Sequence, residues 1–232
     1  MAEINIYRNG EYTKFFSPER ASFPFSNTYE EKRRIILDRL HQGAQSILDL
    51  GGGRGRFSVP LSQNNRVIMA DLSLQMIDEA AAVSARPTQP AMEGTLQFVC
   101  CDASAPPFSQ ELFDVVLAID LLPHLENPAH SLRAICSLLK PGGMAIIDNS
   151  NRSPFWMFAY PEYVNWRKHP IKFLRTFLNG GILPDWTASI SHYSKQEFSA
   201  LLTGAGFVIF DFMELGPSYC PKWHLAFCRK PC

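Results

Sequence analysis

The sequence has 232 residues, of which 46% are hydrophobic, and its 22 basic and 22 acidic side chains balance to a net charge of zero. This predicts one globular domain, or one domain with a sizeable insertion, and excludes a protein held to nucleic acid mainly by phosphate contacts. No apolar run reaches the ~18 residues of a membrane span. The first residues carry charges and lack the apolar core of a secretory signal, so we expect a cytoplasmic protein with no membrane span.

The six cysteines give no sign of a metal centre or a redox motif. None forms a C-x-x-C pair, and no histidine lies at the spacing of a zinc site. Cys100 and Cys101 are adjacent inside an apolar run, where cysteine usually acts as a small hydrophobic residue. We therefore expect reduced thiols and no bound metal.

Short β-rich runs alternate with helical stretches through the middle of the chain. Near-continuous apolar strands suit a sheet that is buried on both faces, which indicates parallel pairing through strand–helix–strand units. The five predicted strands cover residues 46–50, 66–70, 96–101, 113–119 and 144–148.

Helix starts and stops are marked by polar residues, proline and glycine. The S/T-x-x-E pattern at 28–31 and again at 194–197 predicts two helix N-termini with capping boxes. Asn127 followed by Pro128 predicts a third helix, which runs to about Leu139. The sequence KPGG at 140–143 predicts a tight turn into the fifth strand.

Two further strands are predicted near the C-terminus, at 207–213 and 223–229. About nine residues separate them, which is too few for a helical crossover, so they should pair antiparallel.

An aromatic-rich insertion lies between the fifth strand and the last helix, at 151–191. It leaves the fifth strand at its carboxyl end, and so much apolar surface should not stay in water. We expect helices that form a lid and set substrate choice, although core packing is the simpler role for each aromatic side chain alone. Trp156, Tyr160 and Tyr163 lie nearest the fifth strand in sequence and are the candidate substrate contacts.

The strongest motif is the glycine cluster that follows the first strand and opens a helix. The G-x-G-x-x-G fingerprint of dinucleotide-binding proteins fails in every frame, and no Gly-Lys-Ser/Thr of a P-loop follows. What remains is an acid and three alternate glycines: Asp49, Gly51, Gly53 and Gly55. An acid just before the loop suits a ligand with a positively charged end better than it suits a pyrophosphate.

With these motifs the chain resembles the class I S-adenosylmethionine-dependent methyltransferases, in their broad small-molecule branch. The resemblance covers about residues 45–150. It implies that Asp71 holds the two ribose hydroxyls, that Asp102 accepts from the adenine amino group, and that residues 120–124 face the methyl group. Leu72, Met76, Ala103 and Asp120 complete the cofactor contacts that it implies.

The fold predicted from the pattern and the resemblance is α/β. It is a Rossmann-like, mostly parallel seven-stranded sheet with helices on both faces, an antiparallel last pair of strands and a helical lid. The expected parts are an N-terminal helical cap at 1–44, the cofactor-binding core at 45–150, the lid at 151–191 and a completing helix and strand pair at 192–232.

The expected reaction transfers a methyl group from S-adenosylmethionine to an oxygen, nitrogen or carbon atom of a small, partly apolar or aromatic metabolite, as in natural-product or secondary metabolism. A histidine is the usual proton acceptor near neutral pH, and His124 is the first candidate by position, ahead of His192 and His169. Two alternatives remain: another group transfer or a reduction on the same fold, and a binding or regulatory module without catalysis. The oligomeric state is not predicted.

Overall fold

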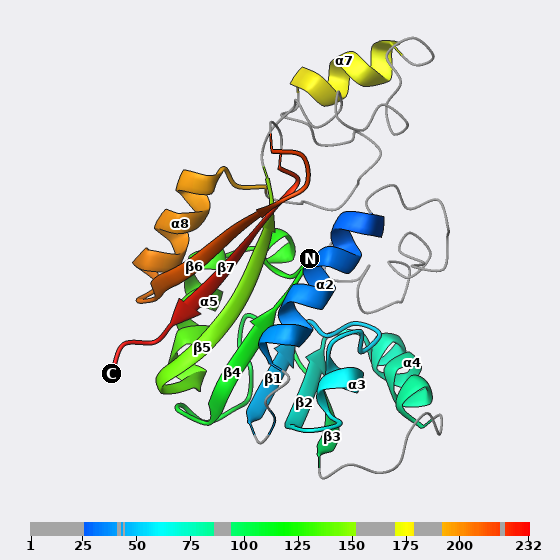
Figure 1. Cartoon of the computed structure of the whole chain (residues 1–232), viewed down its shortest axis with the longest axis vertical. Helices are drawn as coiled ribbons and strands as arrows, with labels where there is room; N and C mark the ends of the chain where they lie inside the picture. The colour runs from blue at the N-terminus through cyan, green and yellow to red at the C-terminus, as the bar shows by residue number, and fades with distance from the viewer. Residues whose placement is uncertain are drawn as a thin grey trace.

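The structure is a computed structural model that describes residues 26–40, 43, 45–85, 94–151, 170–178, 192–218 and 221–232. The elements (Figure 1) are α2 (Ser26–Arg39), β1 (Ser46–Leu50), α3 (Ser58–Leu61), β2 (Arg66–Asp71), α4 (Leu74–Ser84), β3 (Thr95–Cys100), β4 (Phe113–Ala118), the 3-10 turn η2 (Leu122–His124), α5 (Pro128–Leu138), β5 (Leu139–Ser150), α7 (Pro170–Leu178), α8 (Lys195–Gly204), β6 (Val208–Leu215) and β7 (Trp223–Arg229).

The seven strands form one sheet in the order β3-β2-β1-β4-β5-β7-β6. Strands β1 to β5 pair in parallel, whereas β7 runs antiparallel to both of its neighbours, β5 and β6. The predicted fold class is therefore confirmed, including the antiparallel last pair. The parallel order brings the carboxyl ends of β1 to β5 to one edge of the sheet, which is where open α/β sheets bind ligands.

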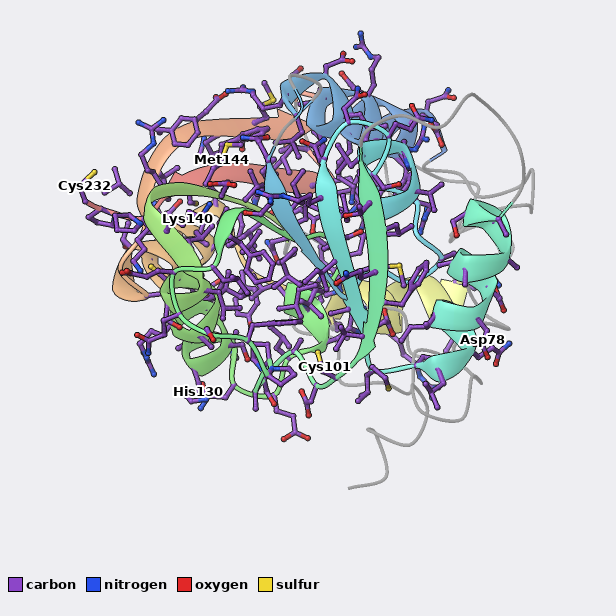
Figure 2. All side chains as sticks on the ribbon, turned by 90° about the horizontal axis from the view of Figure 1, so that it is seen from below. Asp78, Cys101, His130, Lys140, Met144 and Cys232 are labelled. Carbon is purple, nitrogen blue, oxygen red and sulfur yellow. The ribbon has the colours of Figure 1, made fainter. Side chains whose placement is uncertain are left out.

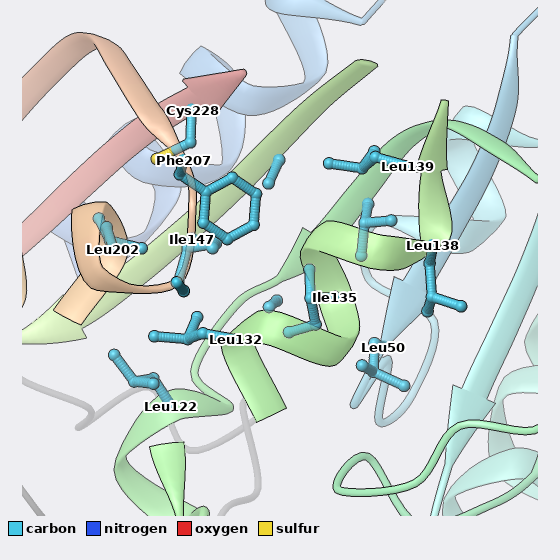
Figure 3. Packing of buried hydrophobic residues seen from close by; sticks show 14 of the residues in the cluster. Leu50, Leu122, Leu132, Ile135, Leu138, Leu139, Ile147, Leu202, Phe207 and Cys228 are labelled. Atoms are coloured by element: carbon cyan, nitrogen blue, oxygen red, sulfur yellow. The ribbon is translucent and has the colours of Figure 1, made fainter. Parts of the chain in front are cut away.

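Alternate residues of each strand point to opposite faces of the sheet. Both faces are apolar, and helices cover both of them. Val115 and Leu117 of β4 belong to a cluster with α2 and α3, on the face that α4 also covers. Val116 and Ala118 belong to the cluster on the other face, with α5 and α8. Figure 3 shows this second cluster, in which Leu132 and Ile135 of α5 and Leu202 of α8 pack against β5.

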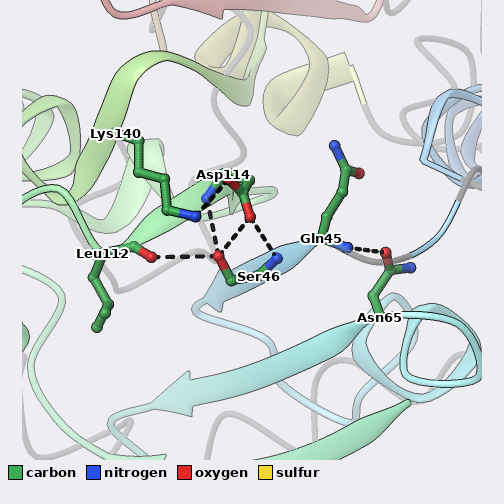
Figure 4. Close-up of polar contacts among 6 residues, drawn as sticks. All are labelled: Gln45, Ser46, Asn65, Leu112, Asp114 and Lys140. Carbon is green, nitrogen blue, oxygen red and sulfur yellow. Dashed lines mark hydrogen bonds and ion pairs between the residues drawn. The ribbon is translucent and has the colours of Figure 1, made fainter. Parts of the chain in front are cut away.

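At the amino ends of the strands, polar contacts fix the pairing of β1 with β4 (Figure 4). The Ser46 N–H and hydroxyl group both donate to the Asp114 carboxylate, at 2.8 and 2.7 Å, and Lys140 Nζ lies 2.7 Å from its other oxygen. Partial burial opposes ionisation of Asp114, but these donors outweigh it and lower the pKa of Asp114 below its usual value.

Most predicted strand ends differ from the observed ones by no more than two residues, but two predicted starts are wrong by more than this. Strand β5 begins at Leu139 rather than Met144, because Leu139 already pairs with Phe113 and the KPGG residues bulge out within the strand, where Lys140 binds Asp114. Helix α2 begins at Ser26, so Thr28 lies inside its first turn and does not cap it. The capping box of α8 and the Asn127–Pro128 start of α5 are confirmed.

Helix α7 is the described part of the predicted lid, and Ile171, Leu174 and Leu178 on it are exposed. The candidate substrate contacts Trp156, Tyr160 and Tyr163 lie outside the described residues. Among the helices that the structure does describe, none has both the length and the apolar character needed to cross a bilayer.

A buried histidine on β7 gives the fold a dependence on pH. The His224 ring lies among aromatic rings, with its centroid 5.6 Å from that of Phe212 and 6.5 Å from that of Phe198. Burial lowers the pKa of His224 to about 4, and the Glu214 carboxylate, 3.6 Å from Nε2, only partly opposes this shift. The unfolded chain, with a histidine pKa of about 6.5, therefore takes up the proton more readily than the folded chain.

We predict that stability contributed by neutral His224 is present above pH 6.5 and is lost as the pH falls from 6.5 to 4. Each pKa unit corresponds to about 1.4 kcal/mol, and solvent screening near the partly exposed Glu214 reduces the effect of the shift on stability. We therefore expect the loss in the free energy of unfolding to be on the order of 1 to 2 kcal/mol. Chemical unfolding measured at several pH values should show a flatter acid slope for His224→Phe than for the parent.

The matched control is His130→Gln, since His130 lies exposed at the periphery (Figure 2). An acid slope that His224→Phe leaves unchanged would assign the loss of stability to other groups.

Candidate functional site

The glycine loop connects β1 to α3 and has a left-handed backbone at alternate residues. The φ angles of Gly51, Gly53 and Gly55 are +76°, +54° and +75°, which side chains with a Cβ rarely adopt. The Gly51 and Gly52 N–H groups both donate to the Ala70 carbonyl oxygen, at 2.7 and 3.2 Å. These bonds hold the loop against the end of β2, so the three glycines predicted from the motif are required by the backbone.

Gly52 is required for a different reason, which the alternate spacing of the motif does not reveal. A Cβ on Gly52 would lie 2.4 Å from Met69 Cγ and 3.1 Å from Asp49 Oδ2. The loop therefore packs directly on the sheet, and only a residue without a side chain fits.

Asp49 lies beneath the loop rather than at its open surface. Its side chain is 1% exposed and accepts a hydrogen bond from the Ser58 hydroxyl at the start of α3. Burial raises the pKa of Asp49 to about 6, with the Ser58 bond opposing and the nearby Asp71 adding to the shift. The Asp49 carboxylate thus links the loop to α3, and when ionised it places a negative charge beneath the loop.

Asp71 at the end of β2 is held by backbone donors on both oxygens. The Gly53 N–H donates to Oδ2 and the Ser73 N–H to Oδ1, each at 2.9 Å. Burial raises the pKa of Asp71, and these donors oppose the shift. An ionised carboxylate offers about four acceptor positions, so acceptor capacity remains for a ligand. Met76, a predicted cofactor contact, is 8% exposed in the first turn of α4, where its N–H donates to Ser73.

A groove of about 370 Å³ lies between the ends of β2 and β3. Its lining residues are Leu72, Leu74, Cys100, Cys101 and Asp102. The predicted residues Leu72 and Asp102 are therefore brought together, and the Asp102 carboxylate also accepts the Ser104 N–H at 2.8 Å. Ala103 follows directly and packs against the core cluster of the α5 face.

Leu74, Cys100 and Cys101 also line the groove, and the sequence pattern did not predict them. Leu74 is 62% exposed, and a leucine three residues after the end of a strand is the sequence signal that could have indicated it. Cys101 lies near the end of β3 (Figure 2), and burial, aided by Cys100 and Asp102, raises its pKa to about 11. It therefore lines the groove as a neutral thiol. Among the described residues, no three His, Cys, Asp or Glu side chains gather as a metal site.

The ends of β4 and β5 carry an acid pair that binds a buried lysine from α2. Lys32 Nζ lies 2.8 Å from Asp120 Oδ1 and 2.5 Å from Asp148 Oδ2, and the Asp120 N–H donates to Asp148 Oδ1 at 2.6 Å. The side chains of Lys32 and Asp148 are 0% and 1% exposed, whereas that of Asp120 is 41% exposed. Asp120 was predicted as a site residue, while Lys32 and Asp148 were not.

The three charged groups shift one another's pKa values. Burial raises the pKa of Asp148 to about 7, against the effect of Lys32. Burial also opposes the charge on Asp120 and on Lys32, but their attraction outweighs it, so the pKa of Asp120 is lowered and that of Lys32 is raised. The Tyr29 and Trp223 rings face the ammonium group, with centroids 4.9 and 5.1 Å from Nζ. At neutral pH the site therefore holds a charged lysine and an ionised Asp120.

His124 ends the η2 turn that follows β4, and burial lowers its pKa to about 4. The structure brings His192 within electrostatic range of His124. Burial, Lys222 and His124 lower the pKa of His192 to about 4, and its Nδ1 lies 3.4 Å from the Ser150 carbonyl oxygen. Both imidazoles are neutral at pH 7. The third candidate, His169, lies outside the described residues.

Residues 48–147 match the model of a protein family described as "Methyltransferase domain". The ubiquinone/menaquinone biosynthesis C-methyltransferase of Francisella tularensis is 26% identical over 139 residues, which are 57% of this chain and 54% of that protein. The ubiquinone biosynthesis O-methyltransferase of Parvibaculum lavamentivorans is 32% identical over 109 residues, which are 46% of this chain and 41% of that protein. The chain thus spans about half the length of the curated relatives it matches.

Among solved structures, the chain is similar in fold to magnesium protoporphyrin IX methyltransferase from Synechocystis, crystallised with S-adenosylhomocysteine. The TM-score is 0.70 at 15% identity, and the match covers 99% of this chain and 98% of that one. At this identity the similarity supports the fold.

The close packing of the glycine loop gives a direct test. We predict that Gly52→Ala lowers the free energy of unfolding by about 1–3 kcal/mol, because the added methyl group forces Met69 or the loop to move. Urea unfolding measures this loss. Gly204→Ala on α8 is the control, since a Cβ there meets nothing within 4 Å. Equal stability of the two variants would mean that the loop is less tightly packed than described.

Proposed function

Residues 48–147 are a class I S-adenosylmethionine-dependent methyltransferase domain, and from this premise we propose that the chain is a methyltransferase for a small molecule. It would bind S-adenosylmethionine and transfer the methyl group to an oxygen, nitrogen or carbon atom of a partly apolar or aromatic acceptor. The observation that carries the proposal is Asp71, which is fixed by two backbone donors beside the glycine loop and the groove.

The residues present fit this cofactor. Asp71 has acceptor positions left for two ribose hydroxyls. The groove beside it is apolar at Leu72 and Leu74 and has a carboxylate at Asp102, as an adenine ring with an amino group requires. Gly51, Gly53 and Gly55 place no side chain between the backbone and a ligand. When bound, S-adenosylmethionine supplies an electrophilic methyl group on a sulfonium ion.

His124 is proposed to take the proton that the substrate loses when it is methylated. It follows β4 at the carboxyl edge of the sheet. Burial, which lowers its pKa to about 4, keeps the imidazole unprotonated at pH 7 and also makes it a weaker base than an ordinary histidine. His192 lies within electrostatic range and would influence the same proton. Asp120, beside η2, places a negative charge at the same edge.

The acceptor class is proposed from the aromatic segment 151–191, with Trp156, Tyr160 and Tyr163 as its contacts. The two relatives named above are C- and O-methyltransferases of ubiquinone biosynthesis, which supports a ring acceptor but leaves the accepting atom open. A role in secondary metabolism and a cytoplasmic setting belong to the same proposal.

We predict that Asp71→Ala weakens S-adenosylhomocysteine binding by about 10- to 150-fold, because hydrogen bonds to a charged acceptor contribute roughly 1.5–3 kcal/mol. Calorimetry with S-adenosylmethionine, S-adenosylhomocysteine and NAD measures this directly, and the parent should bind the first two and not NAD.

The control is Asp78→Ala, since Asp78 is exposed on α4 (Figure 2) and does not line the groove. Equal affinity of the Asp71 and Asp78 variants would remove Asp71 from the site. Binding of NAD in preference to S-adenosylhomocysteine would move the proposal to a reductase.

We also predict that His124→Gln lowers kcat by about 10²- to 10⁴-fold, the usual effect of a general base, and leaves S-adenosylhomocysteine affinity within a few fold. The rate, followed as S-adenosylhomocysteine released with a panel of small phenols and hydroquinones, should fall on the acid side near pH 4, where His124 takes up a proton. His192→Gln is the comparison. A variant at His124 with the parent's kcat and pH profile would exclude it as the base.

A further inference from the structure

We propose that Lys32 is a positioning residue for the transfer reaction: its buried ammonium group fixes Asp120, and through Asp120 the segment 120–124, against the glycine loop. This inference rests on the proposed function, because that function gives the segment its role. Lys32 reaches the site from α2, 88 residues before Asp120 and 116 residues before Asp148 in the sequence.

Lys32 lies where a charged lysine would be destabilising without partners. Its side chain is completely buried, and a buried ammonium group is tolerated only where nearby charges and hydrogen bonds compensate for the lost water. Both carboxylates provide this compensation, and the Tyr29 and Trp223 rings face the same group. The position of Nζ is therefore fixed from several sides.

The backbone of Asp120 has an uncommon conformation. Its φ angle is +55°, and among the described residues only Glu111 shares a positive φ without being glycine. Such a conformation persists where the surroundings hold it in place. Here the side chain is held by Lys32 and the N–H by Asp148. Because Asp120 is also 41% exposed, the fixed carboxylate still reaches the open edge of the sheet.

Two contacts of Leu121 connect Asp120 to the rest of the site. The next residue, Leu121, packs on the glycine loop, since a Cβ on Gly51 would lie 3.0 Å from Leu121 Cδ1. The Leu121 carbonyl oxygen in turn accepts the His124 N–H at 3.0 Å. A shift of Asp120 would therefore move both Leu121, which packs against the glycine loop, and His124, the proposed base.

Helix α2 also holds the other side of the loop. The Arg33 side chain donates to the Arg56 carbonyl oxygen at 3.4 Å, and the Arg56 guanidinium lies 4.3 Å from the centroid of the Tyr29 ring. One helix therefore contacts both the end of the glycine loop and the acids after β4 and β5. This arrangement differs from a lone ion pair that only balances charge.

The test separates positioning from stability with two variants. Lys32→Met leaves Asp148 buried without its cation and is expected to unfold at lower temperature. Lys32→Met combined with Asp148→Asn removes both buried charges, while the side-chain amide oxygen introduced by the second substitution can still accept the Asp120 N–H. We expect this double variant to recover most of the thermal midpoint.

Two measurements are then made on the double variant. Amide hydrogen exchange of the ligand-free protein should be at least tenfold faster at residues 120–124, with no change in α8 (195–204) or β6 (208–215). Calorimetry should show S-adenosylhomocysteine binding weakened by tenfold or more. Lys140→Met is the control, because Lys140 also binds an aspartate across β4 and β5 but at the opposite edge of the sheet.

Parent-like exchange at residues 120–124 together with parent-like affinity in the double variant would overturn the proposal and reduce Lys32 to a charge-balancing role. Faster exchange spread evenly over all strands would also overturn it, since that indicates global destabilisation. If the parent itself binds no S-adenosylhomocysteine, the proposed function fails, and the exchange at 120–124 still decides whether Lys32 fixes this segment.

Discussion

The absence of a side chain at Gly52 is the constraint on which the site depends. The glycine loop lies so close to the sheet that a single methyl group there would overlap Met69, and the same approach covers the Asp49 carboxylate. Because the loop sits this low, the Gly53 N–H reaches Asp71 and the Gly51 N–H reaches Ala70. The ends of β1 and β2 thereby become one rigid surface, with acceptor positions of Asp71 left open above it.

The acids at this edge differ in environment although all are aspartates. Asp49 and Asp148 are almost fully buried, and burial raises the pKa of each toward neutrality. Asp120 has an exposed side chain and a lysine partner that keeps it ionised. The buried acids therefore organise the backbone, whereas Asp120 is the one of these three that presents its charge to the open edge.

Much of the fold could be predicted because its strands are short apolar runs with recognisable ends. The glycine loop, Asp71, Asp102 and the edge position of His124 all follow from residues that are adjacent to those strand ends in sequence. Lys32 and Asp148 could not be found in this way, because their pairing depends on a contact across 116 residues. In the sequence Lys32 stands among other charged residues of α2 and looks like an ordinary surface lysine. The start of β5 was missed for a related reason, since the bulge at 140–143 depends on its binding to Asp114.

The position of β7 has a consequence for how the chain acquires its structure. This strand is the nearest to the C-terminus, yet it lies inside the sheet, between β5 and β6. During synthesis β5 therefore keeps an unpaired edge, and β6 has no partner strand, until residues 223–229 leave the ribosome. Closure of the sheet is a late, long-range event, and a nascent chain that stalls before Trp223 would expose the apolar edge of β5 to other chains.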